Sequence, residues 1–163
     1  MATRSLGDDL VDALGRGELD VQVERRGLRA RAKARGAGPY GADVEEISVE
    51  RCEGRGPVGA DERTGRVSHG IADRVDYLAE PLEVLEHTGD RGQLRSRRER
   101  VRDGEYYEVD VHEGDRVDVT RQRWDRETRQ RRPISRAEGH DTLRRLVDDL
   151  GELIDTAGVE TQD

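Results

Sequence analysis

Two clusters of arginine surround the only tryptophan of the chain, and they are the residues best suited to bind a ligand. The clusters comprise Arg95, Arg97, Arg98, Arg100 and Arg102, followed by Arg121, Arg123, Arg126, Arg129, Arg131 and Arg132. The planar guanidinium group matches the geometry of phosphates and carboxylates. Cations beside an aromatic ring also suit single-stranded nucleic acid. We therefore predict a partner-binding surface that contains Arg121, Arg123, Trp124, Arg129 and Arg131.

Acidic residues alternate with these arginines and leave the role of the surface open. They are Glu99, Glu105, Glu108, Asp110, Asp118, Asp125 and Glu127. Opposite charges that face each other across strands are ordinary surface pairs, so a solvated face is one interpretation. A protein partner or a second copy of the chain is another, and nucleic acid is a third. Our first functional hypothesis is a small, non-catalytic binding or assembly module that uses an arginine-rich sheet face.

Three tyrosines are candidates for a second kind of site. Tyr77, Tyr106 and Tyr107 would line a pocket between the C-terminal helix and a curved sheet. Antiparallel sheets that curl around a helix often enclose such a cavity. The alternative hypothesis is therefore a small-ligand-binding protein, or an enzyme whose pocket lies there.

The remaining motifs give little support for a metal, a cofactor or catalysis. The four histidines are widely spaced and Cys52 has no nearby partner, so we expect no metal site. Residues 36–43 and 54–61 each contain G-x-G-x-x-G, but neither copy is followed by a helical apolar pattern, which nucleotide binding requires. We expect two turns at opposite ends of one strand and no cofactor. Ser68 and His69 would point to opposite faces of a strand, so we lean against an enzyme.

The composition indicates an environment more than an activity. The 163 residues include 29 basic residues, of which only Lys33 is lysine, and 37 acids, for a net charge of −8. Such acidity keeps a protein soluble at high ionic strength, where screening removes the self-repulsion. No apolar run approaches the length of a membrane span, and the N-terminus lacks the apolar stretch of a signal peptide. We expect a salt-adapted, cytoplasmic protein with no membrane partner.

Hydrophobic periodicity predicts the elements that carry these residues. Ser5 and Asp8 have the spacing of a capping box, and Leu6, Leu10 and Leu14 follow on one face of a helix over 5–14. Strict alternation predicts strands over 19–24, 28–35 and 44–52. The stretch 67–85 is expected to hold one or two strands, bent near its proline.

The second half of the chain predicts a meander followed by a helix. Turns at 103–104, 113–115 and 125–128 divide residues 93–134 into three or four antiparallel strands. On the third strand, Arg121 and Arg123 share a face with Val117 and Val119, whereas Trp124 points to the other side. Ser135 and Glu138 have capping-box spacing, and an apolar stripe then continues to Gly158.

These elements predict an α+β fold. We expect a curved, meander-rich antiparallel sheet of about six to eight strands, with a short N-terminal helix and a long amphipathic C-terminal helix packed on one face. Residues 1–158 form one domain and residues 159–163 a frayed tail. The sequence leaves open the strand order and whether the sheet closes into a barrel.

Overall fold

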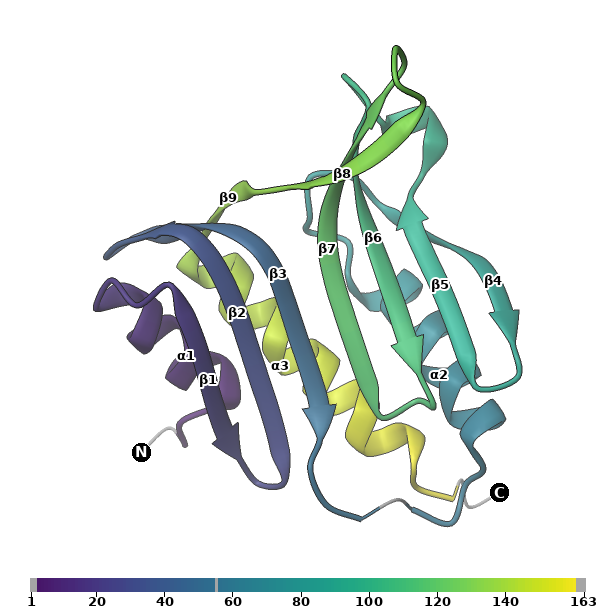
Figure 1. Cartoon of the computed structure of the whole chain (residues 1–163). Helices are drawn as coiled ribbons and strands as arrows, with labels where there is room; N and C mark the ends of the chain where they lie inside the picture. Colours follow the sequence, from purple (N-terminus) through teal and green to yellow (C-terminus); the bar gives the residue numbers. More distant parts are fainter. Residues whose placement is uncertain (1–2, 55, 161–163) are drawn as a thin grey trace.

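The computed structural model describes residues 3–54 and 56–160, which adopt the predicted α+β fold (Figure 1). The α-helices are α1 (Leu6–Gly15), α2 (Ala60–Arg74) and α3 (His140–Ala157), and η1 (Arg98–Arg100) is a short 3-10 turn. The strands are β1 (Asp20–Arg25), β2 (Leu28–Ala37), β3 (Gly41–Arg51), β4 (Leu82–Thr88), β5 (Arg91–Ser96), β6 (Glu105–His112), β7 (Arg116–Asp125), β8 (Gln130–Ile134) and β9 (Arg136–Gly139). They form one antiparallel sheet, which is not closed into a barrel.

The sheet divides near its middle. Its main order is β1-β2-β3-β7-β6-β5-β4, with β8 paired to β7 and β9 paired to β3. Strands β3 and β7 pair with each other only over 46–50 and 116–120. Beyond these residues each acquires its own partner, β9 on β3 and β8 on β7. We call this divergence the fork. Above it, the β7–β8 hairpin projects past the end of the helical layer (Figure 1).

All three helices cover one face of the sheet (Figure 1). Alternate strand residues face this layer, and Val49, Leu94 and Val109 are completely buried. Helix α1 packs directly against α3. The two helices are so close at Gly7 that an added Cβ atom would come within 2.4 Å of the carbonyl oxygen of Arg144. The opposite, outer face of the sheet carries many of the charged strand residues, among them Arg31, Asp110 and Asp118.

Several local predictions are confirmed. The Ser5 hydroxyl accepts a hydrogen bond from the Asp8 amide at 3.1 Å, and the Asp8 carboxylate accepts one from the Ser5 amide at 2.9 Å, so the capping box is present. Asp103 and Gly104 both have positive φ, as the predicted hairpin turn requires. Helix α3 ends at its C-cap Gly158.

The prediction of strands over 67–85 is wrong for most of that stretch. Helix α2 occupies its first part, and the strand β4 begins only at Leu82. The helix was hidden because its buried face includes Thr64 and Ser68, which are fully buried although polar, beside Val67 and Ile71. The spacing of apolar residues alone therefore does not reveal that this segment is an amphipathic helix.

The predicted capping box at Ser135 and Glu138 is also absent. Residues 136–139 form β9, which pairs with β3 up to the Gly41–Gly139 position, and α3 starts one residue later. Pairing with β3 supplies hydrogen-bond partners to this backbone, so the segment stays extended where local spacing favoured a helix.

The two glycine repeats differ in structure. The first forms the turn between β2 and β3, as expected. The second leads directly into α2, with Gly59 as its N-cap, so the expectation that no helix follows it is wrong. Its Gly56 packs against the end of α3, where an added Cβ atom would come within 1.9 Å of the Gly158 oxygen. This glycine therefore serves a close contact between two chain segments.

Candidate functional site: an arginine groove

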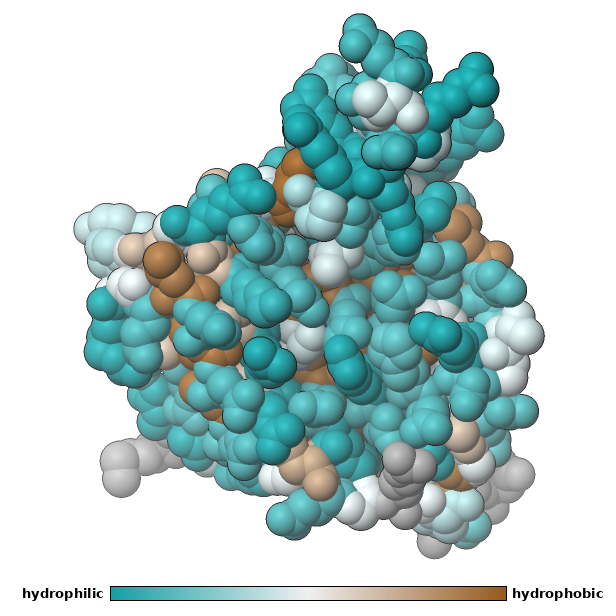
Figure 2. Space-filling view, in the orientation of Figure 1, coloured by the Kyte–Doolittle hydropathy of each residue, from teal (hydrophilic) through white to brown (hydrophobic). Residues whose placement is uncertain are grey.

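A concave groove of about 1110 Å³ opens on the outer side of the sheet, where the β7–β8 hairpin leaves the body of the protein. Strands β4 and β5, the η1 turn, the start of β6 and the hairpin form its wall. Its charged and large side chains are Arg95, Arg98, Arg123, Arg126, Arg132, Glu83, Asp103, Asp125, Glu127, Tyr106, Trp124, Leu85 and Val101. We call it the arginine groove. Figure 2 shows that the outer face is largely hydrophilic, with small separate apolar areas.

Strand pairing places two aromatic rings in the groove. Tyr106 lies opposite Gln122 in the β6–β7 register, and Trp124 is two residues further on, so both point to the outer face. The backbone amide of Trp124 donates a hydrogen bond of 2.9 Å to the carbonyl oxygen of Gly104, which holds the backbone of β7 at this residue in place. The Trp124 side chain remains 46% exposed. The guanidinium of Arg95 lies 5.4 Å from the centre of the Tyr106 ring.

The arginines in and around the groove form no ion pair with any other described residue. This set comprises Arg95, Arg97, Arg98, Arg100, Arg102, Arg123, Arg126, Arg129 and Arg132. Across β7 and β8, Arg123 even faces Arg132, a pairing of like charges. One groove acid, Asp125, accepts hydrogen bonds from the backbone of the hairpin turn, at 2.9 Å from the Glu127 amide, and these bonds lower its pKa. Across β6 and β7, Arg123 faces Glu105, an opposite charge, although the two side chains form no ion pair.

Arginines elsewhere on the molecule are mostly paired. Ion pairs with carboxylates are formed by Arg4, Arg16, Arg25, Arg29, Arg35, Arg51, Arg66, Arg74, Arg116, Arg121, Arg131, Arg136, Arg144 and Arg145. The groove thus holds a local excess of positive charge in a chain of net charge −8.

The outer face below the groove carries acids that lie close together. Asp110 and Asp118 lie directly opposite each other on β6 and β7, next to the buried Glu108. Burial and then the charge of Glu108 raise the pKa of the Asp110 carboxyl. Asp118 forms an ion pair with Arg116 at 3.0 Å, and Glu108 forms one with Arg131 at 2.6 Å, so this face mixes acids with their arginine partners.

The predicted surface residues fall into different environments. Arg123 and Trp124 line the groove, and Arg129 lies in the β7–β8 turn with a φ of 54°. Arg131 lies on the outer face of β8 and donates to both carboxylate oxygens of Glu108 at 2.6 Å. It ties the hairpin to β6, so the structure gives it a supporting contact in addition to its exposed surface.

Arg121 lies on the inner face of the sheet and is not part of this surface. Its side chain forms a 2.5 Å ion pair with Glu80, and it is only 5% exposed. Glu80 also accepts a hydrogen bond of 2.9 Å from the Ser96 hydroxyl. The guanidinium of Arg121 stacks 4.4 Å from the centre of the Tyr107 ring. Arg121 thus lies on the same face of β7 as Val117 and Val119, inside the protein, and Glu80 compensates its charge.

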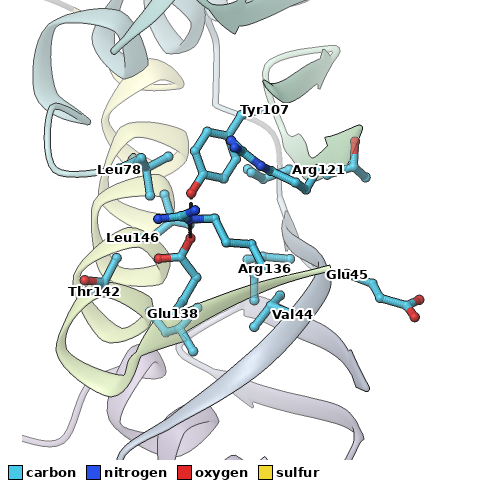
Figure 3. Close-up of a pocket in the computed structure, with 13 residues that line it drawn as sticks. Val44, Glu45, Leu78, Tyr107, Arg121, Arg136, Glu138, Thr142 and Leu146 are labelled. Carbon is cyan, nitrogen blue, oxygen red and sulfur yellow. Dashed lines mark hydrogen bonds and ion pairs between the residues drawn. The ribbon is translucent and has the colours of Figure 1, made fainter. Parts of the chain in front are cut away.

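A small cavity of about 30 Å³ lies beneath the fork, between the sheet and α3 (Figure 3). The Tyr107 hydroxyl points across it and donates a hydrogen bond of 2.5 Å to Glu138, which also pairs with Arg136 at 3.2 Å. Burial, and then the bond to Glu138, raises the pKa of the Tyr107 phenol. The cavity has room for about one or two water molecules. A metabolite pocket is roughly tenfold larger or more.

The three predicted pocket tyrosines are not brought together. Tyr107 lines the cavity under α3, whereas Tyr106 lines the arginine groove on the opposite face. Tyr77 lies beside the outer part of α3, where its hydroxyl donates to Asp149 at 2.8 Å and Arg145 stacks 4.1 Å from its ring centre. No single pocket therefore contains all three.

Sequence reasoning missed the groove's opposite wall. Leu85 and Glu83 lie on β4, a strand whose boundaries the misassigned stretch 67–85 obscured. Arg95 and Arg98 stand on β5 and η1, and the Asp103-Gly104 turn was the signal that brings them beside Trp124. Within 3–54 and 56–160, no cluster of histidine, cysteine and acidic side chains is arranged to hold a metal ion. The same residues contain no helix with the length and apolar character of a membrane span.

No protein family, characterised protein or solved structure matches this chain.

Proposed function

We propose that this chain is a non-catalytic binding protein that holds an anionic, chain-like partner in the arginine groove. The observation that carries the proposal is the set of nine arginines that form no ion pair with a carboxylate of the described residues, gathered on one end of a protein of net charge −8. Like charges held close together repel each other and loosen the compact state. A partner with several negative charges would remove that repulsion.

The shape of the site supports the same proposal. Arginines stand on both walls of the groove, Arg95 and Arg98 on one side and Arg126 and Arg132 on the other. A partner lying between them contacts both rows, as a strand or an extended segment would.

Retention on immobilised heparin, a generic polyanion, tests this function. We expect the protein to bind at low salt in spite of its net negative charge, and the triple variant Arg98→Gln, Arg126→Gln, Arg132→Gln to elute at a clearly lower salt concentration. The matched control is Arg31→Gln, Lys33→Gln, Arg91→Gln, which removes the same charge from three exposed residues of the sheet that also lack ion pairs.

The control should elute like the unchanged protein. Equal losses in the two triple variants would mean that overall charge decides retention, and no retention of the unchanged protein would mean that the groove does not bind polyanions. Either result would overturn the proposal. We further propose that the abundance of acids is an adaptation to a salty cytoplasm, which makes a series of salt concentrations the informative experimental variable.

A further inference from the structure

We infer that the partner held in the arginine groove is single-stranded nucleic acid, an inference that rests on the proposed function and names its ligand class. The groove combines unpaired arginines with two aromatic rings on one face, Tyr106 and Trp124. Proteins that bind single strands without sequence preference use this combination, in which cations track the phosphates and rings stack on the bases.

The positions of the rings fit a strand that lies along the groove. Tyr106 and Trp124 are diagonal neighbours on adjacent strands, a relationship that separates side chains by about 7–8 Å. Each ring therefore offers a separate stacking surface to a different base. Trp124 is nearly half exposed, and Arg95 extends the Tyr106 platform with a second flat cationic surface.

The rest of the lining distinguishes this ligand from an acidic protein. A globular partner needs a fully buried apolar centre at its interface. The groove offers only Leu85 and Val101 as aliphatic side chains among a mostly charged lining. A duplex is also disfavoured, because its bases are already stacked on each other and have no free face for Trp124.

The chain contains a single tryptophan, so the site carries its own spectroscopic probe. We expect an oligothymidylate of about 12 nucleotides, a length within the range of single-strand sites, to quench the fluorescence of Trp124 on binding. Poly-L-glutamate of matched charge has no ring to stack, so it should bind more weakly and without this quenching. A duplex of the same length should also bind more weakly than the single strand.

Two sets of variants separate stacking from charge. Trp124→Ala should weaken binding of a labelled oligothymidylate roughly 10- to 100-fold, whereas Trp124→Phe should retain most of the affinity. Tyr40→Ala, which removes an aromatic ring that is 88% exposed outside the groove, should leave affinity unchanged. The triple variant Arg98→Gln, Arg126→Gln, Arg132→Gln should reduce the slope of log affinity against log salt by about 2, since each phosphate contact contributes about 0.7.

The outcomes identify which statement fails. Binding of poly-L-glutamate or duplex as tight as that of the oligothymidylate, or binding without a change in Trp124 fluorescence, would overturn the single-strand inference and leave the arginine groove as a polyanion site. Loss of binding to every polyanion would overturn the proposed function itself. Thermal melting of each variant confirms that it is folded, and the quenching of Trp124 fluorescence in the unchanged protein keeps the test decisive if Trp124→Ala does not fold.

Discussion

Arg121 and Glu80 form an ion pair of 2.5 Å in which both side chains are almost completely removed from solvent, 5% and 10% exposed respectively. The pair joins the inner face of β7 to the segment that leads into β4, directly behind the arginine groove. It also marks the boundary on β7 between a buried, paired arginine, Arg121, and an arginine that lines the groove, Arg123. Below it the core begins, and beyond it Arg123 and Trp124 belong to the groove.

Glu80→Gln should lower the free energy of unfolding by about 3–5 kcal/mol, because it leaves a buried guanidinium without its counter-charge. Arg121→Met should cost a comparable amount by leaving the carboxylate unpaired. The double variant should cost much less than the sum, which urea denaturation of all four proteins measures. Additive costs would show that the two groups do not compensate each other. Retention of the folded single variants on heparin should be unchanged, since neither residue lines the groove.

Tyr77, which is half-buried, and Tyr107, which is buried, should make the protein lose stability at alkaline pH. Burial, and then hydrogen bonds to Asp149 and Glu138, raise the pKa values of Tyr77 and Tyr107 in the folded state. Their neutral phenols therefore stabilise the fold fully below the unfolded value of about 10, and this contribution is lost as pH rises above it. The free energy of unfolding should fall from about pH 10 upward.

Lys33 is the only lysine of the chain, so few other groups titrate in this range. In a Cys52→Ser background, which removes the thiol, the double variant Tyr77→Phe, Tyr107→Phe should flatten the decline. Tyr40→Phe, at an exposed position, should not. Ultraviolet absorbance of tyrosinate gives an independent measure, because Tyr77 and Tyr107 should ionise only as the protein unfolds. Ionisation of all four tyrosines in one step near the ordinary value would contradict this account.

Gly56→Ala should destabilise the protein by about 1–3 kcal/mol, since the new methyl group would collide with the backbone of Gly158. The repeat provides a matched control. Gly38 occupies the equivalent position in the first copy, is also followed by proline, and has no atom within 4 Å of an added Cβ. Gly38→Ala should change the free energy of unfolding by less than about 1 kcal/mol. Similar effects at the two sites in thermal denaturation would refute the packing explanation.

Arg131→Gln should loosen the projecting hairpin. It removes the 2.6 Å contacts to Glu108 and leaves that buried carboxylate with Gln93 alone, at 2.9 Å, among the hydrogen bonds of the described residues. We expect a cost of about 1–3 kcal/mol and faster amide hydrogen exchange in β8. Arg129→Gln, in the turn, should leave exchange in β8 unaltered. Unchanged protection in Arg131→Gln would show that strand pairing alone holds the hairpin.

Local patterns determined the strands and the outer helices. Alternation with period two identified β1 to β3, β6 and β7, because one face of each strand is more buried than the other. Strand β8 is exposed along almost its whole length, and the turn before it was its signal. The apolar stripe of α3 likewise identified a helix that must cover a sheet. These predictions rest only on the spacing of apolar residues along the chain. They are correct in the elements where the buried residues are the apolar ones.

Only the tertiary structure decided which arginines are free. Charge and spacing treated Arg121, Arg123 and Arg131 alike, yet the fold buries the first against Glu80, exposes the second in the groove and ties the third to Glu108. Helix α2 was hidden for a related reason, since its buried face uses Thr64 and Ser68. The position of a residue in the alternating pattern predicts which face of the strand its side chain occupies. Its ion-pair partner lies on a segment distant in sequence, so only the tertiary structure can identify it.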